Sequence, residues 1–360
     1  MNEEKYLNEI FRKHKKQLYI QLSPSENESI AGFCERLKNK IKGQSCQIIK
    51  AVCFGSLKYQ SEFETEIRKS ISGSFPLTWV EGTNCSNAFM NGLQLWATES
   101  EISYLTTDFN AYASFFEDEN SRYLYIGHIH SDPSQLPKEA YSVILGKLNI
   151  FLENHDFSFK DVVRTWYYLD DILGWYDEFN QVRTDFFKNT GVLTNRIPAS
   201  TGVGGKNEAG SSVTMELLAT QPKNTQVTIE SIAPTLQNEA MEYGSSFSRA
   251  IKISSYKNEW MTISGTASVL PNGKTTNVND LMKQIHFSFQ AIEGLLLKEK
   301  YSFKDIVRAT AYLKDKNTMH VLQSFISENP NYQFPFVISE NTICRDNLLF
   351  EIELDLEKGS

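Results

Sequence analysis

The sequence predicts an α+β protein in which one unit, a mixed sheet with helices packed on one face, occurs in tandem. Three observations support this. Residues 157–171 (FSFKDVVRTWYYLDD) and 301–315 (YSFKDIVRATAYLKD) agree at nine of fifteen positions when paired at an offset of 144, as expected of an internal repeat. Amphipathic stretches typical of helices precede and follow each copy. Strand-like segments close each copy, ending in SSVTMELLAT and NLLFEIELDL.

Each copy is expected to run strand, strand, helix, strand, helix, strand, strand. In the middle copy the helices are predicted in YSVILGKLNIFLENH and WYDEFNQVRTDFFKN, and in the last copy in DLMKQIHFSFQAIEGLLLKEK and TMHVLQSFISEN. Glu216 and Glu351 are expected to share one register position in the two closing strands. The segment TGVGGKNEAGSS (201–212) is predicted to be a glycine-rich loop between two strands.

A fainter copy is indicated before these two. KQLYIQL, SIAGFCERLKNKI, QIIKAVCFGS, EFETEIRKSI, LTWVEG and GLQLWAT follow the same order across residues 16–98. We expect three parts: an N-terminal region over residues 1–104, a middle domain over 105–225 and a final domain over 226–360. The first part is either a degenerate third copy, which would make the chain a pseudo-trimer, or an unrelated segment.

Composition excludes several classes of protein. The 360 residues are 41% hydrophobic and 22% charged, within the globular range. With 36 basic and 44 acidic residues the net charge is -8, which argues against nucleic-acid binding. No apolar run reaches the ~18 residues that a membrane span needs, and the charged N-terminus lacks a signal-peptide core. Five cysteines without a CxxC pair argue against a disulfide framework. We expect a cytoplasmic protein, monomeric or a small homo-oligomer, without nucleic-acid or membrane partners.

The last copy resembles the Rid family (reactive-intermediate deaminase, YjgF type), a small α+β unit of chorismate-mutase-like fold that normally assembles as a trimer with sites between subunits. The resemblance is carried by SSFSRA (245–250), TISGTAS (262–268), KDIVRATAYL and CRDNLLFEIE (344–353). With TWVEG (78–82), RTWYYLDDIL (164–173) and RIPASTGVGG (196–205), the chain from about residue 70 onward resembles the chorismatases, relatives that hydrolyse chorismate. Chorismate is then the implied substrate, with no cofactor and no metal.

Chorismate is a dianion, so its site needs cationic groups, and the planar guanidinium of Arg meets a carboxylate with two hydrogen bonds. The candidates near sheet ends or loops are Arg345, Arg249, Arg196, Arg164 and Arg308. Arg164 and Arg308 belong to the repeated strand. At least one of them is therefore expected to be structural, paired with the nearby Asp161 or Asp305.

Cleavage of an enol ether requires a proton on the methylene carbon, and a carboxylic acid delivers it only if its pKa is raised. Alternation in FEIELDL places Glu351, Glu353 and Asp355 on one face of a strand. The resemblance selects Glu351 as the acid, with burial as the means of raising its pKa. From the residues alone, a solvent-exposed polar face remains open, and Glu353 and Asp355 are assigned to it.

Two positions bear on the product. Family members that form 3-hydroxybenzoate and pyruvate resemble this chain at Gly265 and Cys344, the latter expected to be a pocket wall and not a nucleophile. A buried inert thiol is the alternative for Cys344. Hydrolysis to a dihydroxycyclohexadiene carboxylate, or a mixture of hydroxybenzoates, stays open.

Further contacts are expected around the substrate. Tyr243, Phe247 and Ser264 are predicted to wall the pocket, and backbone N–H groups from Thr201 and Gly202 onward are predicted to reach a carboxylate. His128 and His130 share a strand face, but no third metal ligand follows at suitable spacing, so they are expected at a surface or pocket rim.

Two rival functions come from other classes. A Rid-type imine or enamine deaminase would use Arg345 and Glu351 to activate water, but the tandem copies and the TGVGG and YGSSFSRA segments argue against it. A silent binding or scaffold protein is the second rival. Retention of Cys344, Arg345 and Glu351 in the last copy alone argues against it.

Overall fold

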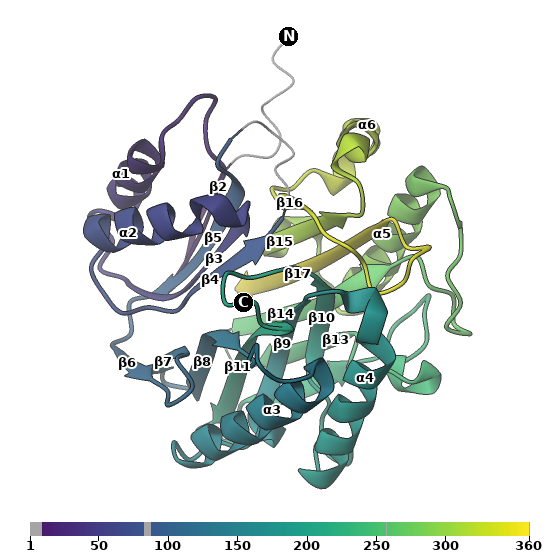
Figure 1. Ribbon diagram of the computed structural model, residues 1–360, viewed down its shortest axis with the longest axis horizontal. Coiled ribbons are helices and arrows are strands. Elements are labelled where there is room, and N and C mark those ends of the chain that lie inside the picture. The colour runs from purple at the N-terminus through teal and green to yellow at the C-terminus, as the bar shows by residue number, and fades with distance from the viewer. Residues whose placement is uncertain (1–8, 83–87, 257, 360) are drawn as a thin grey trace.

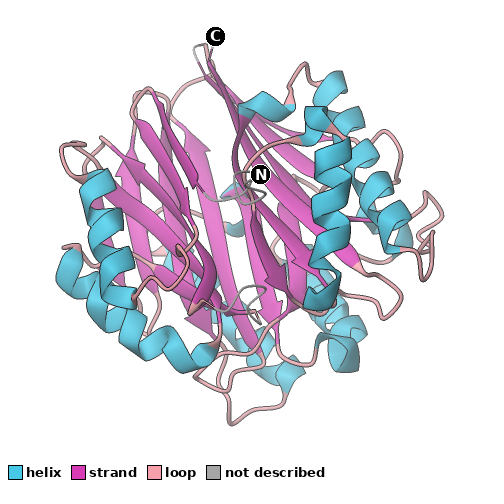
Figure 2. Ribbon diagram, turned by 90° about the horizontal axis from the view of Figure 1, so that it is seen from above, coloured by secondary structure: helices cyan, strands magenta, loops and turns pink. Residues whose placement is uncertain are grey.

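Three β-sheets organise the molecule. The computed structural model describes residues 9–82, 88–256 and 258–359. Within them the sheets face one another, and the helices lie on their outer faces (Figures 1 and 2). Each sheet is formed by one continuous stretch of the chain, so the molecule consists of three successive α+β units.

The first sheet contains, in spatial order, β1 (Glu9–His14), β2 (Gln17–Leu22), β5 (Met90–Thr98), β3 (Gln47–Gly55) and β4 (Leu77–Glu81). Its helices are α1 (Ile30–Ile41) and α2 (Gln60–Ser70). This order of elements confirms that the N-terminal region contains a third, degenerate copy.

The second sheet contains β10 (Ala199–Gly204), β9 (Val162–Leu169), β11 (Val213–Pro222), β8 (Ser121–His130), β7 (Tyr112–Glu117) and β6 (Ile102–Thr106), with helices α3 (Pro137–Glu153) and α4 (Ile172–Asn189). The third contains β12 (Thr228–Ile232), β13 (Ala250–Ser254), β14 (Asn258–Ala267), β17 (Phe350–Gly359), β15 (Ile306–Leu313) and β16 (Val337–Glu340), with helices α5 (Leu281–Lys298) and α6 (Met319–Glu328).

One topology recurs in all three units. The strand after the first helix pairs in parallel with the strand after the second helix, and in antiparallel with the closing strand. The second and third units begin with three strands, where two were expected, because β6 and β12 extend the sheet edge. The first sheet ends at Thr98 and the second begins at Ile102, a few residues before the boundary expected at 104.

The identical SFKD segments form identical turns. They build the short 3-10 helices η3 (Phe159–Asp161) and η5 (Phe303–Asp305) before β9 and β15. Asp161 Oδ2 accepts a hydrogen bond from the N–H of Ser158 at 2.7 Å, and Asp305 Oδ2 accepts one from Ser302 at 2.8 Å. These capping boxes satisfy backbone donors that would otherwise lack partners, which explains why Ser and Asp recur together.

The interior is divided into layers. Each sheet packs its outer face on its own helices. The inner faces meet in one further cluster to which all three sheets contribute, among others through Phe54, Trp166 and Tyr312. The central strands β9 and β15 are therefore buried at every position, and polar side chains on their inner faces lie inside the protein.

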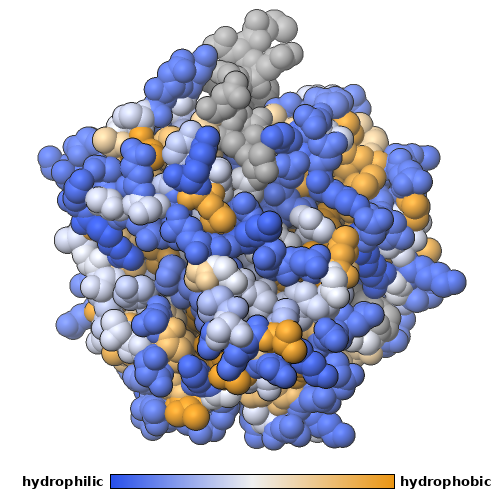
Figure 3. Space-filling view, viewed as in Figure 1, coloured by the Kyte–Doolittle hydropathy of each residue, from blue (hydrophilic) through white to orange (hydrophobic). Residues whose placement is uncertain are grey.

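The surface is ordinary for a globular protein. The face in Figure 3 is mostly hydrophilic, with scattered hydrophobic side chains. No helix in the described part of the chain is long and apolar enough to cross a membrane. Cys34, Cys46, Cys53 and Cys344 form no disulfide, and Cys85 lies outside the described residues.

Candidate active site

Strand pairing corrects the expected equivalence of two glutamates. Because β9 and β15 are related by the offset of 144, Trp166 corresponds to Thr310. Glu216 lies opposite Trp166, and Glu353 lies opposite Thr310. Glu216 therefore corresponds to Glu353, and the expected match with Glu351 is wrong. A slip of two residues keeps each side chain on the same face, so alternation alone could not detect the error.

The third unit alone has a carboxylate at the Glu351 position. Glu351 lies opposite Tyr312, and its counterpart Thr214 lies opposite Tyr168. In the first sheet the corresponding residue is Gly92, opposite Phe54. Of three pseudo-equivalent positions in the molecule, one retains an acid.

Glu351 is buried in a setting that favours its neutral form. The residue is 4% exposed at the start of β17. Burial raises its pKa to about 8, and the charge of Glu353 acts in the same direction. Arg249, Arg164 and Arg345 oppose this increase without overcoming it. At neutral pH the carboxyl group is mostly protonated and can serve as a general acid.

Gly265 provides the space that Glu351 occupies. It lies in an irregular stretch of β14, between the residues that pair regularly with β17. A Cβ atom at this position would lie 1.9 Å from Glu351 Oε1, far inside van der Waals contact. Any larger residue would displace the carboxyl group, so the expected link between Gly265 and the acid has a steric basis.

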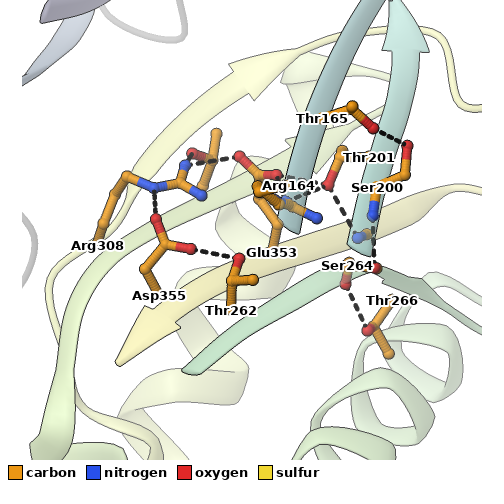
Figure 4. A network of polar contacts seen from close by, with 12 residues as sticks. Arg164, Thr165, Ser200, Thr201, Thr262, Ser264, Thr266, Arg308, Glu353 and Asp355 are labelled. Carbon is orange, nitrogen blue, oxygen red and sulfur yellow. Dashed lines mark hydrogen bonds and ion pairs between the residues drawn. The ribbon is translucent and has the colours of Figure 1, made fainter. Parts of the chain in front are cut away.

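Thr201 joins the second unit to the third (Figure 4). Its Oγ1 accepts hydrogen bonds from the N–H of Gly265 at 2.9 Å and from Arg164 Nη2 at 2.7 Å, and donates to Glu353 Oε2 at 2.5 Å. Arg164 Nη2 also lies 2.5 Å from Glu353 Oε2, and Arg164 is fully buried. Gly265, which Thr201 binds, also lies directly against Glu351. Glu351 is therefore located where β10 of the second unit meets β14 and β17 of the third.

Glu353 and Asp355 were assigned to a solvent face, and this prediction is wrong: they are 0% and 5% exposed. Arg308 binds both, with Nη1 2.7 Å from Glu353 and Nε 2.5 Å from Asp355. Burial alone would raise the pKa of each carboxyl group, but the arginines outweigh it and lower both values. The polar face of β17 points toward the other sheets, and sequence alternation cannot distinguish that interior from solvent.

The expected partners of the two repeated arginines are also wrong. Asp161 and Asp305 cap their turns, whereas Arg164 pairs with Glu353 and Arg308 with Glu353 and Asp355. These partners come from the closing strand of the third unit, more than forty residues away in sequence for Arg308.

Arg249 and Arg345 lie on the Glu351 side of the third unit. Arg249 is 4% exposed, and its guanidinium carbon lies 5.2 Å from the centre of the Phe247 ring. Arg345 is half-buried and donates from Nη1 to the carbonyl of Gly273 at 2.5 Å. Both charges act on Glu351, so the structure brings Arg249 and Arg345 near the acid, with Phe247 against Arg249.

Other predicted residues lie elsewhere or have structural partners. Arg196 donates to the carbonyl of Lys160 at 3.0 Å, in the turn before β9. Ser264 accepts from the N–H of Ser200 at 2.8 Å and donates to the carbonyl of Ser248, joining β10 to the third unit. Tyr243 ends the short helix η4 (Ala240–Tyr243), and its side chain lies outside the described part of the structure.

The predicted glycine-rich loop is partly a strand. Residues from Thr201 to Gly204 belong to β10, and the loop begins after them. The N–H of Gly204 points away from β9 and donates to Thr342, and that of Ser200 points the same way to Ser264. Because N–H directions alternate along a strand, the N–H of Gly202 points to the same edge. A Cβ at Gly202 would meet nothing within 4 Å, so the face of β10 beside this residue is open.

The sequence-based reasoning missed Arg183 of α4. It is 3% exposed, donates to Asn180 at 2.7 Å, and lies 5.9 Å from the Phe247 ring centre. Arg183 occupies the apolar stripe of its helix, four residues from both Phe179 and Phe187. A charged residue at such a position was the signal that could have identified it.

Cys344 is a neutral thiol in this setting. Burial raises its pKa to about 12, and the charge of Glu351 acts in the same direction. Tyr176 is a neighbour of Cys344. Burial raises the pKa of the Tyr176 hydroxyl, and the charge of Cys344 raises it further. A thiol that stays protonated is a poor nucleophile.

The pseudo-equivalent position in the second unit has different chemistry. His128 occupies the place of Gly265, and its N–H donates to Thr78 Oγ1 at 3.0 Å as Gly265 donates to Thr201. Burial lowers the pKa of His130 to about 3, so its ring is neutral at pH 7. Among the described residues, no three His, Cys, Asp or Glu side chains are grouped to hold a metal ion.

Comparisons with known proteins agree with this architecture. Residues 237–354 match the family model described as endoribonuclease L-PSP. A crystal structure of chorismatase superposes with a TM-score of 0.66 at 16% sequence identity, covering 88% of this chain and 94% of that one.

Shorter structures match one unit. The YjgF gene product of E. coli (TM-score 0.28, 21% identity) covers 35% of this chain and 97% of its own, and yeast YEO7 (0.30, 20%) covers 36% and 98%. No curated protein matches the sequence. The chain has the fold of the superposed chorismatase structure, with three successive α+β units.

Proposed function

We propose that this protein is a chorismatase that cleaves the enolpyruvyl ether of chorismate and releases pyruvate and 3-hydroxybenzoate. The observation that carries the proposal is Glu351, a buried carboxyl group with a pKa of about 8 at the junction of two units. Two further observations support the same proposal: 88% of the chain superposes on a chorismatase structure, and one of three equivalent positions keeps an acid.

The proposed reaction begins with a proton. At pH 7 a group of pKa 8 is about nine-tenths protonated, so Glu351 transfers a proton to the methylene carbon of the enolpyruvyl group. The methylene becomes a methyl group, and positive charge develops at the ether carbon. The carboxylate left on Glu351 then stabilises that charge. The neighbouring ring hydroxyl then attacks the ring carbon that bears the ether and gives its proton back to the Glu351 carboxylate. The ring C–O bond breaks, the side chain leaves as pyruvate, and the resulting epoxide opens to 3-hydroxybenzoate, so no water is consumed.

Binding of the dianion is assigned to the cations around Glu351. Arg249 and Arg345 supply guanidinium groups for carboxylates, Phe247 provides an aromatic wall, and the N–H of Gly202 donates at the open edge of β10. The same cations hold the pKa of Glu351 below the value that burial alone would produce.

Other residues hold this site in place. Arg164, Thr201 and Ser264 are assigned to positioning, because Arg164 Nη2 and the hydroxyls of Thr201 and Ser264 form hydrogen bonds with protein groups. Arg196 is left out of the contact set because it binds the Lys160 carbonyl. A role for Tyr243 stays a prediction.

The aromatic product is proposed because of Gly265 and Cys344. Gly265 leaves room for the acid to approach the substrate closely. Cys344 adds a neutral wall that gives water no base to activate it. Both features favour internal displacement over attack by water, which would produce the dihydroxycyclohexadiene carboxylate.

The experiment is incubation of purified protein with chorismate, without metal or nucleotide, followed by chromatography and mass analysis. We expect equal amounts of pyruvate and 3-hydroxybenzoate. Glu351→Gln should abolish turnover and retain binding of the dianion, whereas Glu153→Gln on the exposed face of α3 should match the wild type. Pyruvate with the diol would overturn the product assignment alone. Absence of pyruvate, with ammonia release from a small imino acid, would favour a deaminase.

A further inference from the structure

A cavity lies where the three sheets converge, away from Glu351. Its volume is about 70 Å³, and its walls come from all three units. Glu357 contributes to it six residues after Glu351 on β17, roughly 20 Å away at ~3.3 Å per residue. Figure 1 shows the end of β17 between the three sheets. The cavity is therefore a separate feature from the candidate active site.

Five aromatic residues contribute to its wall. Tyr19 and Trp96 stack with centroids 6.1 Å apart, Trp96 meets Phe116 edge-on at 5.8 Å, and Phe116 stacks on Tyr123 at 4.8 Å. Trp260 of β14 adds a fifth ring from the third unit. Such faces carry partial negative charge and attract cations, with Trp the strongest.

The polar edges of these rings already have partners. Trp96 Nε1 donates to Gln17 Oε1 at 2.8 Å, and the hydroxyl of Tyr123 donates to Asp118 Oδ2 at 3.1 Å. These two donors are therefore not free for a molecule in the cavity. Donation from Tyr123 to a carboxylate also enriches the electron density of its ring.

The charged groups of the lining are carboxylates. Glu357 is 4% exposed and Asp118 is half-buried, and no Lys or Arg is among the described residues that line the cavity. Glu357 Oε1 lies 3.0 Å from His14 Nδ1, and the Tyr19 hydroxyl also interacts with this carboxylate, whereas Oε2 has no hydrogen-bond partner among the described residues. A buried carboxylate oxygen without a donor is costly, and a cationic ligand would relieve that cost.

A smaller cavity of about 20 Å³ adjoins the first and shares Tyr19, Trp96 and Trp260 with it. Its inner wall includes Lys50 and Arg308. Asp355, which is paired with Arg308, also lines this smaller cavity, so its lining is positive by one charge and is less favourable to a cation than the larger cavity beside Glu357.

We propose that the outer cavity binds a small organic ammonium ion, whose charged head lies against the Trp96 and Trp260 faces with Glu357 as counter-charge. A liquid water molecule occupies about 30 Å³, so 70 Å³ accommodates a head group of a few non-hydrogen atoms. The proposal does not depend on the reaction assigned to Glu351.

The test is calorimetric titration of the full-length protein with choline chloride and with 3,3-dimethylbutan-1-ol, the uncharged isostere of choline. We expect saturable one-to-one binding of choline, and about tenfold weaker binding of the alcohol. Glu357→Gln, nearly identical in shape, and Trp96→Leu should each weaken choline binding by about tenfold. Glu153→Gln should leave it unchanged.

Three results would overturn the proposal. Equal affinity for choline and the alcohol would indicate an apolar hollow without cation selectivity. Choline binding that survives both Glu357→Gln and Trp96→Leu would place the site elsewhere. No saturable heat from choline, in protein whose thermal unfolding and circular dichroism are normal, would show that the cavity binds no ammonium ion.

Discussion

Glu351→Gln should change how the stability of the protein depends on pH. The pKa of Glu351 is raised from 4.5 to about 8, first by burial and then by the charge of Glu353. In the unfolded chain the same group titrates near its ordinary value. Because the folded state holds the proton more tightly, the raised pKa contributes its full stability below pH 4.5. That contribution is lost as pH rises through 8.

The magnitude follows from the two pKa values. Each pH unit between them is worth about 1.36 kcal/mol, so the full loss is about 5 kcal/mol, of which about 3 kcal/mol is lost by pH 7. The Gln variant has no proton to lose. Its free energy of unfolding relative to wild type should therefore rise by about 3 kcal/mol between pH 4.5 and pH 7 and level off above pH 9.

Urea unfolding followed by tryptophan fluorescence measures this difference at each pH. Glu153→Gln, an exposed matched change, controls for the loss of a carboxylate. If plots of the free energy of unfolding against pH stay parallel for Glu351→Gln and the wild type from pH 4.5 to 9, the raised pKa is refuted. Turnover gives a second readout: it should fall tenfold per pH unit above pH 8 in the wild type and drop by about 10²–10⁴ in the variant.

Three further predictions concern neighbouring residues. Gly265→Ala places a methyl group 1.9 Å from Glu351 Oε1. Turnover measured by pyruvate release should therefore fall at least as far as in Glu351→Gln. Unchanged turnover would show that the carboxyl group has room to move. Arg308→Met leaves Glu353 without one of its two cations and should cost about 3–5 kcal/mol in urea unfolding; a loss below 1 kcal/mol would contradict the buried network. Cys344→Ala should retain pyruvate release and alter only the ratio of aromatic to diol product, because a thiol of pKa about 12 is no nucleophile; complete inactivation would contradict that role.

Periodicity predicted the helices and strands well because each unit repeats the same hydrophobic pattern. The repeated strands β9 and β15 were predicted from local residues, and the first unit was recognised as one of two possibilities, a degenerate copy. The β10 edge was missed because glycine is typical of loops, whereas Gly202 and Gly204 lie extended against β9 and residues 342–343.

The site was only partly readable. Glu351, Gly265, Arg249 and Arg345 were identified through resemblance, and the structure brings them together. Arg183 was missed because its partners lie on β10 and on its own helix.

The sequence by itself determined the repeated α+β unit, because hydrophobic spacing and turn residues act over a few positions. Together with a family resemblance, it also led to the prediction of Glu351 as the acid and of Arg345 as a substrate contact. Only the tertiary structure decided what the polar face of β17 contacts. The inner faces of the three sheets pack against one another. The polar side chains of β17 are therefore buried and form ion pairs with Arg308. The same closure raises the pKa of Glu351, since desolvation depends on atoms contributed by units far apart in the chain.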